Sequence, residues 1–430
     1  MQPRLSTLSI HAGARPDPAT GARAVPIYET TSFVFRDTGQ AAAAYAYDDP
    51  SPIYTRLGNP TTAVLEARLA ALHGAAGAVA LASGQAATLA TVLGCCRAGQ
   101  NLVCANAAYG GTLALLKHTC ARMGIEARFA EASDPPAWEK ATDGQTRLYL
   151  AEAIDNPRGR VADVEALARA ARRHGVPLGV DNTFCPPPVF DPFDHGADLA
   201  VYSLTKMVGG HGVAIGGAVV ERGGFDWSAG GLFPGLAGPD PANHGLDPWA
   251  KWGKSGLNGG SEAFVGRLRM DALRNMGACM SPFTAWLLLL GVETLPLRAR
   301  QHCANALAVA RHLSGHPAVA WTDYAGLEGH PDHARAKAWM PLGPGAVMAF
   351  GLKGGREAGK RLINRVRLAS HLANVLDAKT LVIHPASTTH SQLTEAELAA
   401  AGVRPEMVRL SVGLEDAADI TGDLDQAMEG

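Results

Sequence analysis

The chain has 430 residues, 47% of them hydrophobic, and a formal net charge of −2. This length can bury a large core and predicts a larger and a smaller domain, while the nearly balanced charge argues against nucleic acid as a partner. The seven cysteines are scattered without a C-x-x-C pair and no apolar run is long enough to cross a bilayer, so we expect a cytoplasmic protein without disulfides, metal or membrane segment.

Residues 1–60 show no regular pattern and predict an extended arm that packs on another body, such as a second subunit. Within this arm, Tyr54 and Arg56 lie on one side of an extended segment. Arginine can bind a phosphate through two hydrogen bonds, and a tyrosine hydroxyl can donate one. Taken alone, the pair is more often an ordinary surface contact.

After a helical stretch at 61–73, an apolar strand at 78–82 leads into Ser83, Gly84 and Gln85. This pattern predicts a strand, a tight turn and the start of a helix. The N–H groups and the dipole of a helix start suit an anion. A simple serine cap would explain the same residues.

Three further strand ends carry polar or aromatic residues. Tyr109 enters a glycine turn and could lie flat on a planar cofactor, although such a residue is more often a packing tyrosine. Asp181 follows a buried strand and could cap a helix or keep a pyridine nitrogen protonated. Asn156 follows another strand. The strands and the helix of this region are expected at 101–105, 146–151, 163–174 and 177–180.

A buried strand at 199–202 is followed by Ser203, Thr205 and Lys206, a glycine-rich loop and a second strand at 213–220. Burial lowers the pKa of a lysine and makes it a better nucleophile toward a carbonyl, while the two hydroxyls suit a phosphate. Pyridoxal phosphate requires this combination. A surface lysine is the simpler alternative, whereas the P-loop and dinucleotide fingerprints of a nucleotide-binding protein or dehydrogenase are not matched.

The rest of the chain predicts an insertion at 221–265, two helices and a C-terminal domain of alternating strands and helices. Arg409 lies in the last strand and could bind a carboxylate or form a structural ion pair. We expect an arm at 1–60, a large domain at 61–281 and a C-terminal part at 282–430. The elements of this last part are expected at 282–294, 298–313, 346–352, 356–368, 380–383 and 407–412, followed by a final helix.

The order of elements up to residue 220 predicts an α/β fold with a mostly parallel sheet and helices on both faces. In such a sheet the carboxyl ends of the strands meet at one edge, where ligands bind. Each residue at these ends is a weak signal alone. The combined signal comes from five chemically compatible residues expected on one edge, namely Ser83, Tyr109, Asn156, Asp181 and Lys206.

In their order, these motifs resemble the Cys/Met-metabolism family of pyridoxal-phosphate enzymes of fold type I, over nearly the whole chain. The resemblance implies a mostly parallel seven-stranded sheet and a smaller α+β C-terminal domain. The motifs are Tyr54-Thr-Arg56, Ser83-Gly-Gln85-Ala-Ala, Tyr109-Gly-Gly-Thr, Asn156-Pro157, Asp181-Asn-Thr-Phe, Ser203-Leu-Thr-Lys206, His384-Pro-Ala-Ser-Thr-Thr-His390 and Arg409-Leu-Ser-Val-Gly413.

The resemblance also implies roles for these residues. Lys206 would carry pyridoxal 5′-phosphate and act as the base, Asp181 would pair with the ring nitrogen, and Tyr109 would stack on the ring and assist proton transfer. The implied phosphate ligands are Ser83, Gly84, Gln85, Ser203 and Thr205, with Tyr54 and Arg56 from a neighbouring subunit. The implied substrate ligands are Arg409, Asn156 and Ser387, and Asn156 also contacts the cofactor.

Within the family, the long insertion with Trp227 is typical of the branch that combines O-acetylhomoserine with sulfide or a small thiol. This implies replacement of acetate to give homocysteine or methionine, in a homo-oligomer, expected to be a tetramer, with shared sites. The alternatives are cystathionine γ-synthase and methionine or cystathionine γ-lyase activity, although methionine γ-lyases usually carry cysteine where this chain has Gly111. Leu376 replaces an expected glycine and Asn243 an expected tyrosine, which could shift substrate choice.

Overall fold

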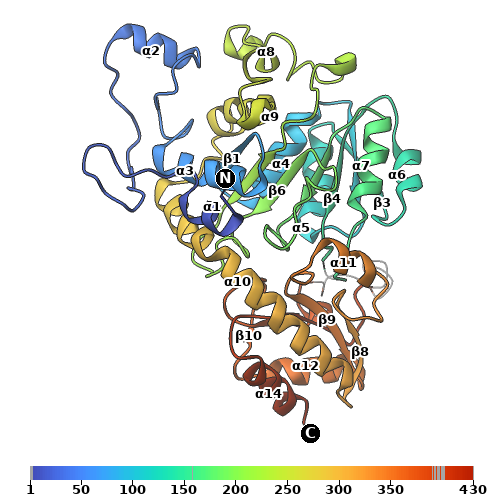
Figure 1. Ribbon diagram of the computed structural model, residues 1–430. Coiled ribbons are helices and arrows are strands. Elements are labelled where there is room, and N and C mark those ends of the chain that lie inside the picture. The colour runs from blue at the N-terminus through green and yellow to red at the C-terminus, as the bar shows by residue number, and fades with distance from the viewer. Residues whose placement is uncertain are drawn as a thin grey trace.

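The structure is a computed structural model that describes residues 3–156, 158–389, 391, 394, 398 and 402–429. Its larger body is a seven-stranded sheet between helices, and a smaller domain with a five-stranded sheet is joined to it by the long helix α10 (Figure 1). The predicted α/β class, with a smaller α+β domain at the C-terminal end, is therefore confirmed.

The large sheet has the strand order β1-β7-β6-β5-β4-β2-β3, and within it β7 alone runs antiparallel to its neighbours. The central strands are short and buried along their whole length, as in parallel sheets covered on both faces. The strands are β1 Gly77–Leu81, β2 Asn101–Ala105, β3 Glu126–Ala130, β4 Thr146–Glu152, β5 Leu178–Asp181, β6 Leu199–Ser203 and β7 Gly217–Glu221.

Helices cover the two faces of this sheet with separate apolar clusters. Leu65 of α3, Leu167 of α7 and Leu288 of α10 pack in one cluster. Val92 of α4 and Phe264 of α9 pack in the other. The helices of the large domain are α3 Pro60–His73, α4 Gly84–Cys95, α5 Gly110–Ala114 with the π-helical turn Leu115–Cys120, α6 Pro135–Ala141, α7 Val164–Arg173, α8 Pro248–Trp252 and α9 Ala263–Leu268 with the π-helical turn Arg269–Asn275.

The smaller domain has the strand order β10-β11-β12-β9-β8, and helices α12 and α14 pack against each other beside it. The C-terminal end of α10 contacts β8, β9 and α14, so this helix belongs to both domains. The elements are α10 Pro282–Gly315, β8 Val319–Asp323, α11 His333–Trp339, β9 Val347–Leu352, α12 Gly355–Arg365, β10 Ser370–His371, β11 Leu381–Ile383, β12 Met407–Ser411 and α14 Ala417–Met428.

Two expected boundaries are wrong. The predicted helices at 282–294 and 298–313 are one helix, α10, which continues through Pro296 because its apolar side is held in the core. The strand expected at 213–220 begins only at Gly217, since Val213 and Ile215 lie in the preceding loop with 64% and 66% of their surface exposed.

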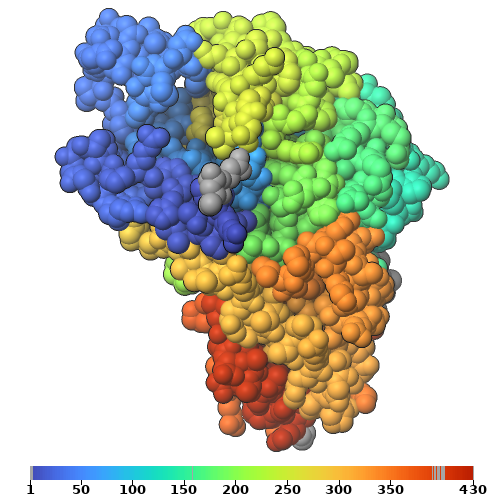
Figure 2. Space-filling view, in the orientation of Figure 1, coloured from blue at the N-terminus to red at the C-terminus, as the bar shows by residue number. Residues whose placement is uncertain are grey.

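The N-terminal arm is only partly irregular, which corrects the prediction for residues 1–60. It contains α1 (Leu5–His11) and α2 (Thr38–Tyr45). Helix α2 is an alanine-rich segment capped by Asp37, whose side chain accepts a hydrogen bond from the N–H of Gln40 at 2.8 Å. Helix α1 packs on α3 and α10, whereas the segment around α2 projects away from the body (Figures 1 and 2).

Candidate active site

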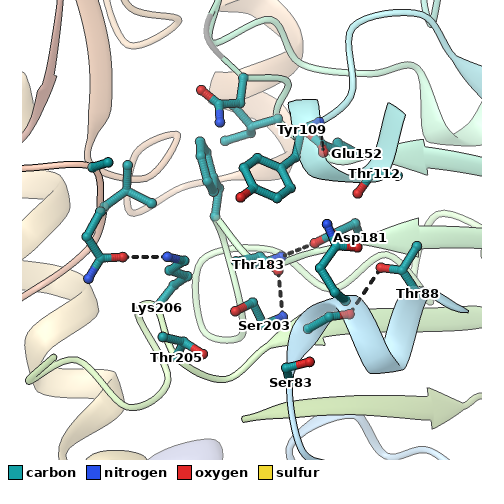
Figure 3. Close-up of a pocket in the computed structure, with 18 of the residues that line it drawn as sticks. Ser83, Thr88, Tyr109, Thr112, Glu152, Asp181, Thr183, Ser203, Thr205 and Lys206 are labelled. Carbon is teal, nitrogen blue, oxygen red and sulfur yellow. Dashed lines mark hydrogen bonds between the residues drawn. The ribbon is translucent and has the colours of Figure 1, made fainter. Parts of the chain in front are cut away.

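A cavity of about 290 Å³ lies at the carboxyl ends of β4, β5 and β6, against residues 373–375 of the C-terminal domain. This is the edge of the sheet at which the sequence predicts a site. Its lining includes Ser83, Gly84, Gln85, Thr88, Tyr109, Glu152, Asn156, Asp181, Thr183, Ser203, Thr205, Lys206, Asn374 and Arg409 (Figure 3).

Lys206 lies in the turn that follows β6 and extends into the cavity (Figure 3). Its Nζ donates a hydrogen bond to Oδ1 of Asn374. Burial, and to a smaller extent the charge of Arg409, lowers the pKa of Lys206 below its ordinary value. A larger fraction of this amine is therefore neutral and able to act as a nucleophile or base.

Asp181 ends β5 and faces the same cavity. Its Oδ1 accepts a hydrogen bond from the N–H of Thr183 at 3.0 Å, and Oγ1 of Thr183 accepts one from the N–H of Ser203 at 2.8 Å. Burial raises the pKa of the Asp181 carboxyl, and the hydrogen bonds from Thr183 oppose this rise. In the described part of the chain no cation pairs with Asp181, so a cationic ligand group would stabilise its ionised form.

The start of helix α4 forms a polar corner beside Lys206. The hydroxyl of Ser83 caps the helix by accepting a hydrogen bond from the N–H of Ala86 at 3.1 Å. A Cβ atom at Gly84 would lie 2.6 Å from Cβ of Ser203, so the close approach of the two segments requires glycine there. Oε1 of Gln85 is buried and has no hydrogen-bond partner among the described residues. With the hydroxyls of Ser203 and Thr205, this corner suits an anion such as phosphate.

On the C-terminal side, Arg409 of β12 faces the cavity with 8% of its surface exposed. Its guanidinium donates to Oδ1 of Asn156 at 3.1 Å, and no carboxylate pairs with it among the residues that the structure describes. A buried, unpaired guanidinium suits a ligand carboxylate, which it can bind through two hydrogen bonds. Tyr109 also lines the cavity, and 52% of the surface of this residue is exposed.

Three predicted residues are not among those that line the cavity. Tyr54 is 40% exposed, and the Arg56 guanidinium donates to the carbonyl oxygen of Arg274. The hydroxyl of Ser387 is paired with Nδ1 of His384 at 2.9 Å. Their assigned roles stay predictions. Pro157 and His390, which belong to two of the sequence motifs, lie outside the described residues.

Several polar residues of the cavity had no role predicted from the sequence, among them Glu152 and Asn374. Glu152 is the last residue of β4 and could have been found by the same rule that selected Asp181. Asn374 lies in the short connection between β10 and β11. No periodic pattern marks that connection, so nothing in the sequence predicts its contact with Lys206.

The residues fit a cofactor that combines an aldehyde, a basic ring nitrogen and a phosphate. Lys206 matches the aldehyde, Asp181 the nitrogen and the α4 corner the phosphate, and Arg409 is left for an amino-acid carboxylate. The fold and the site thus have the features of a pyridoxal-phosphate enzyme of fold type I. Among the described residues no group of His, Cys, Asp or Glu is placed to hold a metal ion, and no helix meets the length and hydropathy needed to span a membrane.

Comparison with known proteins gives the same class. Residues 6–429 match the family model described as Cys/Met metabolism PLP-dependent enzyme. An O-acetyl-L-homoserine sulfhydrylase of Thermus thermophilus is 49% identical over 99% of this chain and 100% of its own, and one of Leptospira meyeri is 47% identical over 98% and 96%.

A crystal structure from Campylobacter jejuni, assigned as an O-acetylhomoserine (thiol)-lyase, superposes with a TM-score of 0.94 at 36% identity. It covers 99% of this chain and 100% of that one, and it carries pyridoxyl-lysine phosphate at its position 205. The chain belongs to the Cys/Met metabolism family of PLP-dependent enzymes, and its cofactor is pyridoxal phosphate.

Proposed function

We propose that this protein is an O-acetyl-L-homoserine sulfhydrylase. It replaces the acetate of O-acetyl-L-homoserine by sulfide, or by a small thiol, and gives L-homocysteine, or methionine when the thiol is methanethiol. The observation that carries the proposal is the juxtaposition of Lys206, Asp181 and Arg409 in one cavity. Relatives named O-acetyl-L-homoserine sulfhydrylase over nearly the full length support the choice of substrate.

The cavity residues divide the task of holding cofactor and substrate. Arg409, with Asn156 beside it, binds the α-carboxylate of the amino acid and so orients its Cα toward Lys206. The N-terminal end of α4 holds the phosphate together with Ser203 and Thr205. Asp181 holds a proton on the ring nitrogen, and Tyr109 supplies an aromatic face and shields the site from water.

When bound, pyridoxal phosphate supplies an electron sink that stabilises negative charge beside the substrate amine. Lys206 then moves the protons of the reaction. Its neutral Nζ takes a proton from Cα and would pass it to the bound cofactor, which leaves the amine neutral again and able to take a proton from Cβ, so that the Cγ–O bond can break and acetate can leave. Sulfide forms the new Cγ–S bond, and the same amine returns the protons. Oδ1 of Asn374 accepts a hydrogen bond from Nζ and would hold this amine while it is not bonded to the cofactor.

Gly111 supports a reaction in which sulfide or a thiol replaces acetate, rather than a γ-lyase reaction. A Cβ atom at this position would lie 2.3 Å from Nε2 of Gln85 and 2.5 Å from Cε1 of Tyr109. The cysteine expected at this place in methionine γ-lyases would therefore displace a residue of the phosphate corner or the ring of Tyr109.

Purified protein incubated with O-acetylhomoserine provides the test. We expect homocysteine to form only when sulfide is present, and a slower reaction when O-succinylhomoserine is the substrate. Release of α-ketobutyrate from O-acetylhomoserine or methionine without sulfide would contradict the proposal and identify a γ-lyase. Cysteine as the preferred sulfur donor would identify a cystathionine γ-synthase.

The assembly of the protein into an oligomer is part of the same proposal. We infer a homo-oligomer, most simply a tetramer built from two dimers, in which Tyr54 and Arg56 of one subunit contact the phosphate bound by its neighbour. The exposure of Tyr54 and the position of both residues outside the cavity of their own chain support this arrangement. The cytoplasmic location expected from the sequence stays a prediction.

A further inference from the structure

Glu152 is a buried acid that lines the cavity and has no role in the reaction described above. It ends β4 and pairs in register with Asp181 of the neighbouring strand β5. Only 8% of its surface is exposed, and it lies beside Tyr109 in Figure 3.

The carboxyl group of Glu152 holds the turn that carries Tyr109. Its Oε1 accepts a hydrogen bond from the backbone N–H of Tyr109 at 2.6 Å. Tyr109 is the N-cap residue of α5, and its own side chain makes no capping hydrogen bond, so Glu152 satisfies a donor at the helix start. Because 52% of the surface of Tyr109 is exposed, the position of its ring depends on the backbone from which it extends.

The surroundings favour the neutral form of Glu152. Two carboxyl groups lie side by side at the ends of β4 and β5, and no cation pairs with either one in the described part of the chain. Burial, and then the charge of Asp181, raises the pKa of Glu152 well above its ordinary value. The basic ring nitrogen of the cofactor pairs with Asp181, which leaves Glu152 as an uncharged acceptor.

We propose that Glu152 is a positioning residue, which holds the Tyr109 turn and thereby sets the tyrosine ring against the face of the cofactor. The proposal rests on the cofactor site inferred above, and it assigns Glu152 no contact with substrate and no proton transfer. Its Oε1 acts through Tyr109, so the effect of removing it depends on the presence of the Tyr109 side chain.

Apoprotein titrated with pyridoxal phosphate tests this role without a catalytic assay. Glu152→Gln keeps an uncharged acceptor oxygen, and we expect a cofactor Kd within about threefold of wild type and an unchanged visible circular dichroism of the bound cofactor. Glu152→Ala removes the acceptor, and we expect a Kd about tenfold higher and a weaker visible band. If the alanine variant does not fold, Glu152→Met removes the acceptor oxygen while the side-chain volume stays nearly constant, and the same increase in Kd is expected.

A double-mutant cycle with Tyr109→Ala separates positioning from a purely structural effect. In the Tyr109→Ala background, we expect Glu152→Ala to change the cofactor Kd by less than about twofold, because the residue that it positions has gone. Fully additive effects would overturn the proposal. Glu131→Ala, which removes a neighbouring acid paired with Arg158, is the matched control and should leave the Kd unchanged.

The remaining outcomes are also decisive. If Glu152→Gln binds the cofactor as poorly as Glu152→Ala, the charge of Glu152 matters and the positioning role is wrong. If Glu152→Gln binds normally but loses catalysis, Glu152 transfers a proton and the role is again wrong. Wild-type protein that does not bind pyridoxal phosphate would instead refute the proposed function itself.

Discussion

At the scale of single residues, Leu376 has a strained backbone conformation directly beside the cavity. It has a φ of +59° with its side chain fully buried, at the position where the resemblance predicts glycine. Its N–H donates to Oγ of Ser411 at 2.6 Å, and the residues just before it, Asn374 and Val375, line the cavity. A left-handed conformation costs a non-glycine residue about 1–2 kcal/mol, so packing of the leucine side chain offsets this cost.

Substitutions at Leu376 should therefore reverse the usual order of alanine and glycine. Both Leu376→Ala and Leu376→Gly lose the buried side chain and should lower the thermal midpoint. We expect the glycine variant to be the more stable of the two by about 1 kcal/mol, because glycine adopts positive φ without strain. Leu381 in strand β11 is the control position, and there we expect the alanine variant to be more stable than the glycine variant. A Leu376→Ala variant with a higher thermal midpoint than Leu376→Gly would contradict this explanation.

The sequence was sufficient to locate most of the candidate site. Ser83, Tyr109, Asp181 and Lys206 each follow an apolar strand, and parallel topology brings such strand ends together. Glu152 ends a buried strand as Asp181 does, so the same rule could have identified it, although that rule was not applied to this strand. Asn374 was missed because its contact with Lys206 depends on how the second domain docks, which no local pattern encodes.

At the scale of secondary structure, a buried histidine attaches helix α10 to the C-terminal domain. His302 is fully buried, and its Nδ1 pairs with the carbonyl oxygen of Val412 at 2.8 Å, which requires Nδ1 to donate. Its Nε2 has no partner among the described residues. Burial lowers the pKa of His302 from 6.5 to about 4.

This burial predicts a specific acid sensitivity. Between pH 6.5 and about 4 the unfolded chain binds a proton at His302 that the folded chain does not, so stability is present above pH 6.5 and is lost as the pH falls. From pH 7 to pH 5 the loss should be about 2 kcal/mol.

Thermal midpoints at the two pH values measure this loss. His302→Gln should show a smaller difference between pH 7 and pH 5 than wild type, whereas His118→Gln, at an exposed position, should behave like wild type. Equal pH dependence in the His302 variant and wild type would show that this histidine does not set the acid sensitivity.

The strands of the central sheet could be predicted because each is a short apolar run between turn signals. Strand β3 could not, since this edge strand is largely solvent-accessible and lacks such a run. The sequence predicts a helix break around Pro296 because proline lacks the N–H that a helix needs. Tertiary packing of the apolar side of α10 overrides that local preference.

At the scale of the whole molecule, exposed apolar side chains support assembly into an oligomer. Phe283, Leu290 and Leu297 are 52%, 45% and 66% exposed and recur at seven-residue intervals, so they lie on one face of α10. Val34 of the projecting arm is fully exposed. Surfaces of this kind are typical of contacts between subunits.

Hybrid oligomers test whether neighbouring subunits share a site. Arg56→Ala and Lys206→Ala should each inactivate the homo-oligomer. If Arg56 serves the neighbour's site, both changes fall on one site of a hybrid dimer and the other site is intact, so the hybrid should recover about half of the wild-type activity. Differently tagged subunits allow the hybrid to be purified. A hybrid without recovery would place Arg56 in its own subunit's site or outside the site.

The central claim is that Lys206 is the residue that binds the cofactor aldehyde. Borohydride reduction of the protein with pyridoxal phosphate fixes the cofactor covalently to the amine that carries it, and peptide mass mapping identifies that residue. The account predicts a pyridoxyl group on the peptide that contains Lys206, in nearly one copy per chain. Labelling of a different lysine, or of none, would contradict it.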